Sequence, residues 1–201
     1  GSTPLTPFVN DNGKDGVAWA NSLFEDNAEY GFGMRIATDA KLATICNILK
    51  AAKANVEPEL QAVIDDYFAH IKDRDYVKTI APKLVELVKA SKDESVKEVL
   101  AYERDLVDKS VWIIGGDGWS YDIGYGGVDH VMANEADVNI LVLDTEVYSN
   151  TGGQASKSSQ TGSINKFTAS GKKEAKKNLP LMAMAYGHVY VGCIALGANP
   201  A

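Results

Sequence analysis

Two short polar turns, each directly after an apolar run, are the feature of this sequence that most restricts its fold. The first turn, Gly116-Asp117-Gly118, follows residues 111–115, and the second, residues 144–153, follows residues 138–143. Apolar runs of this length that end in glycine-rich turns predict buried strands. Because residues 123–133 between them have a helical pattern, we expect the strands to be parallel. Parallel strands bring their carboxyl ends to one edge, where open α/β sheets bind ligands.

Helical patterns surround this pair of strands. We expect an irregular entry segment at 1–34, in which Gly31 and Gly33 break any long helix, followed by a helix at 35–55. Patterns at 60–71, 77–88 and 93–109 predict a helical insertion at about 57–109 within a helical segment at 35–109. A long loop at 149–173, a short helix at 179–185 and a third strand at 189–195 should follow.

These elements predict an α/β fold in which helices flank an open, mostly parallel sheet. Residues 110–201 form its β-α-β core, and the whole chain, 1–201, is expected to be a single domain.

Charge and composition limit the partners that the chain can have. Its net charge of -7 argues against nucleic acid, because phosphate backbones usually need a basic face. No apolar run approaches the length of a membrane span, and the first residues do not resemble a signal peptide. Cys46 and Cys193 lie in apolar stretches and are expected to be buried thiols, with a disulfide or a cluster ligand as the alternative. A reducing cytoplasm fits this cysteine usage.

The two turns carry oxygen atoms of the kind that bind a hard cation. Asp117 supplies a carboxylate, Thr145 a hydroxyl 28 positions later, and Val147 a main-chain carbonyl. With two phosphate oxygens and a water, they would complete the six-oxygen shell that Mg²⁺ prefers. The side chains that follow are placed to donate to phosphate oxygens: Ser149, Asn150 and Thr151. Each residue alone has a plainer interpretation, such as a surface turn or a strand end, and their joint spacing favours a site.

Longer stretches of the sequence resemble one enzyme family. The glycine turn with a metal-binding turn after it resembles the thiamine-diphosphate fingerprint. Two stretches closely resemble pyruvate:ferredoxin (flavodoxin) oxidoreductase: Gly-Gly-Asp-Gly-Trp-Ser-Tyr-Asp-Ile-Gly-Tyr-Gly-Gly-Val-Asp-His at 115–130 and Leu-Asp-Thr-Glu-Val-Tyr-Ser-Asn-Thr-Gly-Gly-Gln at 143–154. Residues 19–31 and 171–173 resemble the same family, so the resemblance covers nearly the whole chain. It implies the thiamine-diphosphate-binding fold.

The resemblance also assigns roles to particular positions. Asp117, Thr145 and the Val147 carbonyl would bind Mg²⁺. The residues that would surround the diphosphate are Gly116, Asp117, Gly118, Trp119, Thr145, Val147, Ser149, Asn150 and Thr151. Asn150 would also face the reacting end of the cofactor and is the catalytic candidate. Phe24 would line the cofactor pocket, with an ordinary core aromatic as an equally weighted alternative.

For the intact enzyme the resemblance implies oxidative decarboxylation of pyruvate to acetyl-CoA and CO₂. Electrons would pass through [4Fe–4S] clusters to ferredoxin or flavodoxin, and coenzyme A would take the acetyl group. No cysteine here matches a cluster ligand, and the glutamate and arginine that complete the family's active site lie in another domain. We therefore expect a partial thiamine-diphosphate-binding domain that is inactive alone and works with the remaining domains of the same enzyme.

Several broader expectations follow from the same resemblance. The intact enzyme is expected to be a homodimer of anaerobic metabolism, located in the cytoplasm or in a hydrogenosome-like compartment. The alternative is a non-catalytic module or subunit that is active only when assembled with partner chains.

Overall fold

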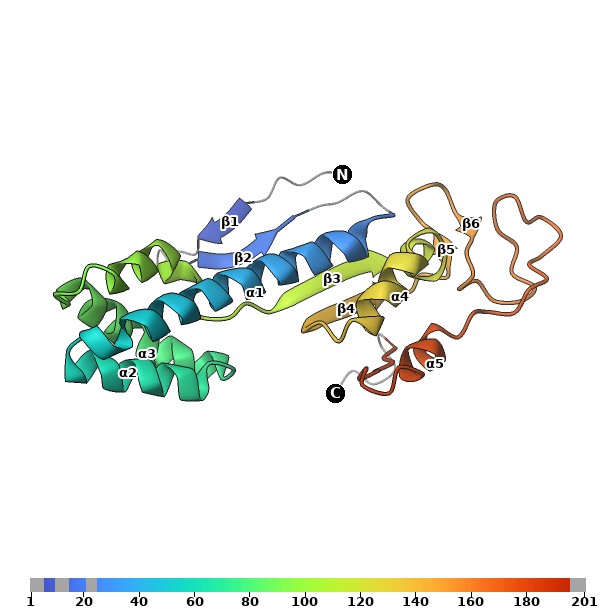
Figure 1. Cartoon of the computed structure of the whole chain (residues 1–201). Helices are drawn as coiled ribbons and strands as arrows, with labels where there is room; N and C mark the ends of the chain where they lie inside the picture. Colours follow the sequence, from blue (N-terminus) through green and yellow to red (C-terminus); the bar gives the residue numbers. More distant parts are fainter. Residues whose placement is uncertain (1–5, 10–14, 21–24, 196–201) are drawn as a thin grey trace. The chain divides into compact units, whose positions relative to one another are not determined.

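The computed structural model describes residues 6–9, 15–20 and 25–195 and divides into two compact units. The strand unit comprises residues 1–32 and 112–201, and the helical unit comprises residues 33–111. Helix α1 (Asn27–Ala52) begins in the strand unit and continues into the helical unit (Figure 1). These divisions lie close to 35 and 109, the bounds expected for the helical segment.

Amphipathic helices form the helical unit around one apolar core. Helices α2 (Pro58–His70) and α3 (Arg74–Ala90) and the 3₁₀ helix η2 (Val96–Asp105) supply most of it together with α1. Its largest buried side chains are Ile45, Leu49, Leu60, Ile64, Tyr67, Leu84 and Leu106. The predicted insertion is therefore helical, but its last element is a shorter 3₁₀ helix rather than an α-helix over 93–109. Tyr102 leaves the helical region of the backbone there, with φ -112° and ψ 17°.

A two-stranded parallel sheet, β3 (Val111–Gly116) with β4 (Val138–Leu143), lies at the centre of the strand unit. The connection runs through the π-helical turn η3 (Gly118–Ile123) and helix α4 (Tyr125–Ala133), as Figure 1 shows. Ile113 of β3 is buried, whereas its neighbours Trp112 and Ile114 are exposed. The residues that share the core with Ile113 come from α1, η3, α4 and α5 (Leu179–Met184): Ala28, Trp119, Val128, Val131, Met132 and Ala183. The α/β class predicted from the sequence is confirmed.

Helix α1 corrects the expected start of the chain. It begins at Asn27, although Gly31 and Gly33 were expected to break it. A Cβ atom on Gly31 would lie 2.3 Å from Ile113 Cγ1, so the bare Cα lets the helix approach β3 closely. That packing outweighs the roughly 1 kcal/mol that glycine costs a helix interior. The segment expected to be irregular also contains an antiparallel pair, β1 (Thr6–Val9) with β2 (Asp15–Trp19).

The expected third strand at 189–195 does not form. These residues are irregular, and Tyr190 and Ile194 are 95% and 88% exposed. A strand needs the hydrogen-bonding edge of a neighbouring strand, and within the described residues only β3 and β4 pair with each other in this sheet.

The cysteines partly differ from expectation. Both are free thiols, but only Cys46 is partly buried, and burial raises the pKa of its thiol. Cys193 is exposed because the strand expected around it is absent. Among the residues that the structure describes, no helix is long and apolar enough to cross a membrane.

Candidate functional site

The two polar turns meet at the carboxyl ends of β3 and β4. Asp117 follows β3 directly and is 1% exposed. Its Oδ1 accepts hydrogen bonds from the Thr145 main-chain N–H at 3.2 Å and from the Thr145 hydroxyl at 3.0 Å. Thr145 Oγ1 also lies 3.2 Å from the main-chain oxygen of Val147. The structure thus gathers into one cluster the three oxygens that the sequence selected as cation ligands.

The distances within this cluster are those of ordinary hydrogen bonds, and they also lie near the separation of neighbouring ligand oxygens around Mg²⁺. Mg²⁺ holds its oxygen ligands at about 2.0–2.1 Å in an octahedron, so neighbouring ligand oxygens lie about 2.9 Å apart. The distances from Thr145 Oγ1 to Asp117 Oδ1 and to the Val147 oxygen, 3.0 Å and 3.2 Å, are close to that value. Within the described ranges no group of three His, Cys, Asp or Glu side chains is placed to hold a metal. A cation here would therefore depend on hydroxyl, carbonyl and ligand oxygens as well as Asp117.

The second turn is a β-hairpin rather than a simple strand end. Its arms are β5 (Val147–Tyr148) and β6 (Gln154–Ala155), which pair antiparallel. Gly152 and Gly153 have φ angles of +115° and +86°, and the Gly153 N–H donates to the Tyr148 oxygen at 2.8 Å. Glycine is needed at both positions because other residues rarely adopt such angles. The hairpin tip is therefore residues 149–153.

The predicted phosphate donors lie on this tip. Ser149, Asn150 and Thr151 are all exposed. Ser149 Oγ lies 2.9 Å from Thr145 Oγ1, so it adjoins the oxygen cluster. Thr151 instead donates to Gln154 Oε1 at 2.6 Å within the hairpin. The Asn150 side chain makes no hydrogen bond within the described part of the chain, so its amide is accessible to a ligand.

The two glycines beside Asp117 have different surroundings. A Cβ atom on Gly118 would lie 2.6 Å from the ring of Tyr148, which packs against the bare Cα. At Gly116 the nearest atom would be the Leu143 oxygen at 3.9 Å. Burial, together with Asp122 and Asp117, raises the pKa of Tyr148 to about 12. Protein packing accounts for Gly118, whereas Gly116 leaves open space.

Two other predicted residues are placed differently. Trp119 is 1% exposed and belongs to the core cluster, and its indole N–H has no hydrogen-bond partner within the described residues. A contact of Trp119 with a diphosphate would therefore use its main chain. Phe24 lies outside the described residues.

Sequence reasoning missed a group of buried serines that follows the hairpin. Ser156, Ser158 and Ser159 are 4%, 0% and 0% exposed. Ser156 donates to Asp117 Oδ2 at 2.5 Å, Ser158 donates to Asp144 Oδ1, and Ser159 donates to the Glu146 oxygen. The only signal in the sequence is a run of small hydroxyl residues soon after Gly152-Gly153, in a stretch whose composition is typical of a solvated loop.

Lysines of the long loop and of the segment after it pair with carboxylates of η3 and of the second turn. Lys157 pairs with Asp122 at 2.6 Å, and Lys176 pairs with Asp144 at 2.8 Å and with Glu146 at 3.0 Å. Burial acts to raise the pKa of Asp144, but hydrogen bonds from Lys176 and Ser158 outweigh it and the pKa is lowered. Hydrogen bonds from Lys176 and Gln160 lower the pKa of Glu146. For Lys176, the two carboxylates outweigh burial and raise its pKa.

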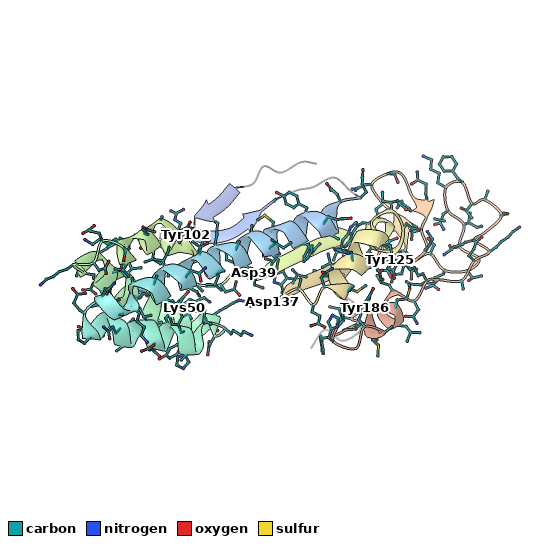
Figure 2. All side chains as sticks on the ribbon, in the orientation of Figure 1. Asp39, Lys50, Tyr102, Tyr125, Asp137 and Tyr186 are labelled. Atoms are coloured by element: carbon teal, nitrogen blue, oxygen red, sulfur yellow. The ribbon has the colours of Figure 1, made fainter. Side chains whose placement is uncertain are left out.

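Two tyrosines and a lysine connect helix α4 to the chain that follows the long loop. Figure 2 labels Tyr125, at the start of α4, and Tyr186, just after α5. Their hydroxyls donate to the same oxygen of Asp129, at 3.3 Å and 2.6 Å. Lys177 places its ammonium 3.1 Å from the centre of the Tyr125 ring. These contacts hold the segment after the loop against α4.

The strand unit has a pocket of about 360 Å³ beside the serines. Its wall includes Ser156, Asp122 and three lysines, Lys157, Lys172 and Lys177. The remaining lining residues are Ala155, Thr168, Glu174 and Ala175. A larger hollow of about 610 Å³ in the helical unit is lined by the exposed α2–α3 turn at Lys72–Lys78. We place the candidate site at the oxygen cluster rather than at either hollow, because its carboxylate, hydroxyl and carbonyl oxygens are suitable ligands for a hard cation.

Comparison with known proteins gives a consistent picture. Residues 98–196 match the family described as thiamine pyrophosphate enzyme, C-terminal TPP binding domain. The chain is 47% identical over 99% of its length to the pyruvate:ferredoxin oxidoreductase of Moorella thermoacetica, and 47% identical over 99% to the pyruvate-flavodoxin oxidoreductase of Trichormus variabilis. It is 44% identical over 99% to the probable pyruvate-flavodoxin oxidoreductase of Escherichia coli.

These alignments cover only 18%, 17% and 16% of the three relatives, so the chain spans less than a fifth of their length. A solved structure of 2-oxoglutarate:ferredoxin oxidoreductase from Magnetococcus marinus matches 38% of this chain and 27% of its own, at 27% identity and a TM-score of 0.36.

Proposed function

This chain is homologous over 99% of its length to one segment of the pyruvate:ferredoxin and pyruvate-flavodoxin oxidoreductases, and from that premise we propose that it holds the magnesium–diphosphate end of thiamine diphosphate. The observation that carries the proposal is the cluster of Asp117, Thr145 and Val147 oxygens at the ends of β3 and β4. Its donor set suits a hard cation that also binds phosphate oxygens. All three positions lie within residues 98–196, the stretch that matches the thiamine pyrophosphate family.

Each residue has a distinct part in this proposal. Asp117, Thr145 and the Val147 carbonyl would hold Mg²⁺, which neutralises the diphosphate. Ser149 would donate to phosphate oxygens from the hairpin tip, and Thr151 would do so after releasing its hydrogen bond to Gln154 Oε1. Asn150, whose amide has no partner within the described residues, is proposed to face the reacting end of the cofactor. When bound, thiamine diphosphate supplies the electron sink that decarboxylation of a 2-oxoacid needs.

Backbone groups complete the proposed contacts. Gly116 leaves space in which a diphosphate can approach the main chain, because among the described residues, its two chain neighbours aside, only the Leu143 oxygen lies within 4 Å of a Cβ position there. Gly118 and Trp119 offer main-chain N–H groups in the first turn of η3, where donors lack partners within the helix. Phe24 is proposed to line the same pocket.

We propose that the wider function is that of the named relatives, an oxidoreductase that converts pyruvate and coenzyme A to acetyl-CoA and CO₂ with ferredoxin or flavodoxin as electron acceptor. The iron–sulfur ligands would come from elsewhere in such an enzyme. Neither Cys46 nor Cys193 belongs to a group that could hold a metal among the described residues. The share of each relative that the chain covers, less than a fifth, supports a role alongside other domains.

Binding of Mg²⁺ and thiamine diphosphate tests the site directly. In a protein of full family length that carries this segment, titration calorimetry should give a clear heat for the wild type. The Asp117→Ala and Asp117→Asn variants should lose most of the affinity, at least about 100-fold, because a ligand to the cation is removed. The exposed Asp137→Ala variant serves as the matched control and should bind normally. Equal heats for wild type and both Asp117 variants would remove the assigned site.

A further inference from the structure

Three serines bind to both turns of the candidate site from one short stretch of chain. Ser156, Ser158 and Ser159, here called the serine clamp, are all buried. Their hydroxyls donate to Asp117, Asp144 and the Glu146 main chain. Asp117 belongs to the turn after β3, and the other two belong to the turn after β4, so the clamp joins turns that are separate in sequence.

Ser156 fixes the orientation of the Asp117 carboxylate. Its hydroxyl donates to Oδ2 at 2.5 Å, while Oδ1 is directed at Thr145. The Ser158 N–H donates to Ser156 Oγ at 3.0 Å, which occupies the hydroxyl oxygen as an acceptor and leaves its proton for Asp117. With Oδ2 held in this way, the carboxylate cannot rotate without losing a buried charge-assisted hydrogen bond. Oδ1 therefore stays in the oxygen cluster.

Ser158 and Ser159 fix the other turn. Glu146 has a φ angle of +63°, a conformation that is unfavourable for a residue with a side chain. Its carbonyl accepts from Ser159, and its N–H donates to Asp144 Oδ1 at 3.1 Å. Ser158 donates to that same Asp144 oxygen. These bonds hold Glu146 on both sides, and Glu146 separates the two proposed ligands of the second turn, Thr145 and Val147.

We propose that the serine clamp positions the cation site, with Ser156 as the positioning residue for Asp117 and Ser158 and Ser159 as those for the second turn. None of the three touches the cation. They act by holding Asp117 Oδ1, Thr145 Oγ1 and the Val147 oxygen at the mutual distances seen here. The inference rests on the proposed function, because it assigns a role in the same site.

The test replaces Ser156 in a protein of full family length that carries this segment. Mn²⁺ is the probe, with thiamine diphosphate present, and its affinity is read from the electron paramagnetic resonance of free Mn²⁺. Ser156→Ala should bind Mn²⁺ about 10–100-fold more weakly, the usual cost of losing a partner that orients a metal ligand. Ser163→Ala is the matched control, since Ser163 lies in the same loop and donates to the Gln160 oxygen at 2.7 Å. That control should keep the wild-type affinity.

Two further variants separate positioning from packing. Ser156→Thr keeps the hydroxyl and adds one methyl group at a residue that lines the 360 Å³ pocket, so Mn²⁺ affinity should stay within about threefold of wild type. Ser156→Cys nearly keeps the volume but is a weak donor, so affinity should fall at least about fivefold even if Ser156→Ala does not fold.

The outcomes distinguish this inference from the proposed function. If the wild type binds no Mn²⁺ with thiamine diphosphate, the proposed function fails and the inference fails with it. If the wild type binds but the alanine or cysteine variant binds equally well, the clamp has no positioning role and the proposed function stands. A threonine variant as weak as the cysteine variant would also overturn the inference, because the hydroxyl would not be what matters.

Discussion

Gly116 and Gly118 lie two positions apart beside Asp117, but they meet different neighbours. The Tyr148 ring occupies the place where a Gly118 side chain would begin, whereas nothing in the described chain closely approaches Gly116. Tyr148 belongs to β5, so its packing on Gly118 brings the second turn against the first. Gly118 therefore allows the two turns to pack together, whereas Gly116 leaves space beside its main chain.

We predict that alanine lowers the stability at Gly118 much more than at Gly116. Gly118→Ala should lower the free energy of unfolding by about 1–3 kcal/mol, because the new methyl group forces the Tyr148 ring away. Gly116→Ala should change it by no more than about 0.5 kcal/mol. Urea denaturation followed by circular dichroism measures both. Equal losses of unfolding free energy in the two variants would mean that the Tyr148 contact is not the reason for glycine at position 118.

The loop that follows the hairpin is held by more hydrogen bonds than its composition predicts. Its Ser, Gly and Lys content indicates a solvated segment, and it has little regular structure in Figure 1. Hydrogen bonds hold it nonetheless: the Gly162 N–H donates to the Lys172 oxygen at 2.7 Å, and the Lys172 N–H donates to the Ser163 oxygen at 3.0 Å. The Lys172 ammonium is buried and donates to the Ser159 oxygen at 2.7 Å. Contacts of Lys172 thus join distant parts of the loop to one another.

The ion pairs of Lys176 predict how the loop depends on pH. The folded-state pKa values of Asp144 and Glu146 lie below 3.8 and 4.5, so their contribution to stability is complete above those values and is lost as the pH falls through the lowered ones. The pKa of Lys176 lies above 10.5, so its contribution is complete below that pH and is lost as the pH rises through the raised value. Between about pH 6 and pH 9 the stabilisation should be constant.

Lys176→Gln should therefore lower the free energy of unfolding by about 0.5–1 kcal/mol at pH 7, since the pair is partly solvent-screened. The difference from wild type should shrink as the pH falls below 3.8 and through the lowered pKa values of the two carboxylates, because protonation removes their charge. The exposed Lys173→Gln variant controls for the loss of a positive charge in the same segment. Denaturation curves across this pH range would contradict the prediction if the Lys176 difference did not change with pH.

At the scale of the whole molecule, the chain is similar to one segment of longer proteins. It covers less than a fifth of the relatives with which it aligns. Within the strand unit, the sheet leaves Trp112 58% exposed and Leu143 53% exposed, which is unusual for residues of an α/β sheet. The candidate site gathers the oxygens of Asp117, Thr145 and Val147 beside the exposed hydroxyl and amide groups of the hairpin tip.

We predict that the 201 residues alone do not convert pyruvate. They should bind Mg²⁺ and thiamine diphosphate only weakly, because the chain spans less than a fifth of the relatives that it matches and would lack contacts made by the rest of such a protein. Coenzyme A-dependent acetyl formation measures the activity, with a protein of full family length as the positive control. Activity of the 201-residue chain itself, under conditions in which that control is active, would disprove this prediction.

The sequence alone determined the α/β class, the helical insertion and the position of the two turns, because apolar periodicity and glycine-rich turns are local signals. It also selected the Asp117, Thr145 and Val147 oxygens, since their order along two parallel strands fixes which edge they share. In the structure the Asp117 and Val147 oxygens both lie within hydrogen-bonding distance of the Thr145 hydroxyl, at the edge where both strands end.

Only the tertiary structure decided the features that depend on residues distant in sequence. Gly31 stays in a helix because Ile113 packs on it, and residues 189–195 stay irregular because no strand of the described ranges pairs with them. The serine clamp is invisible in the sequence, where Ser156 resembles any loop serine, because its role depends on a carboxylate 39 positions earlier. Burial and hydrogen bonding, which set these outcomes, are properties of the folded chain.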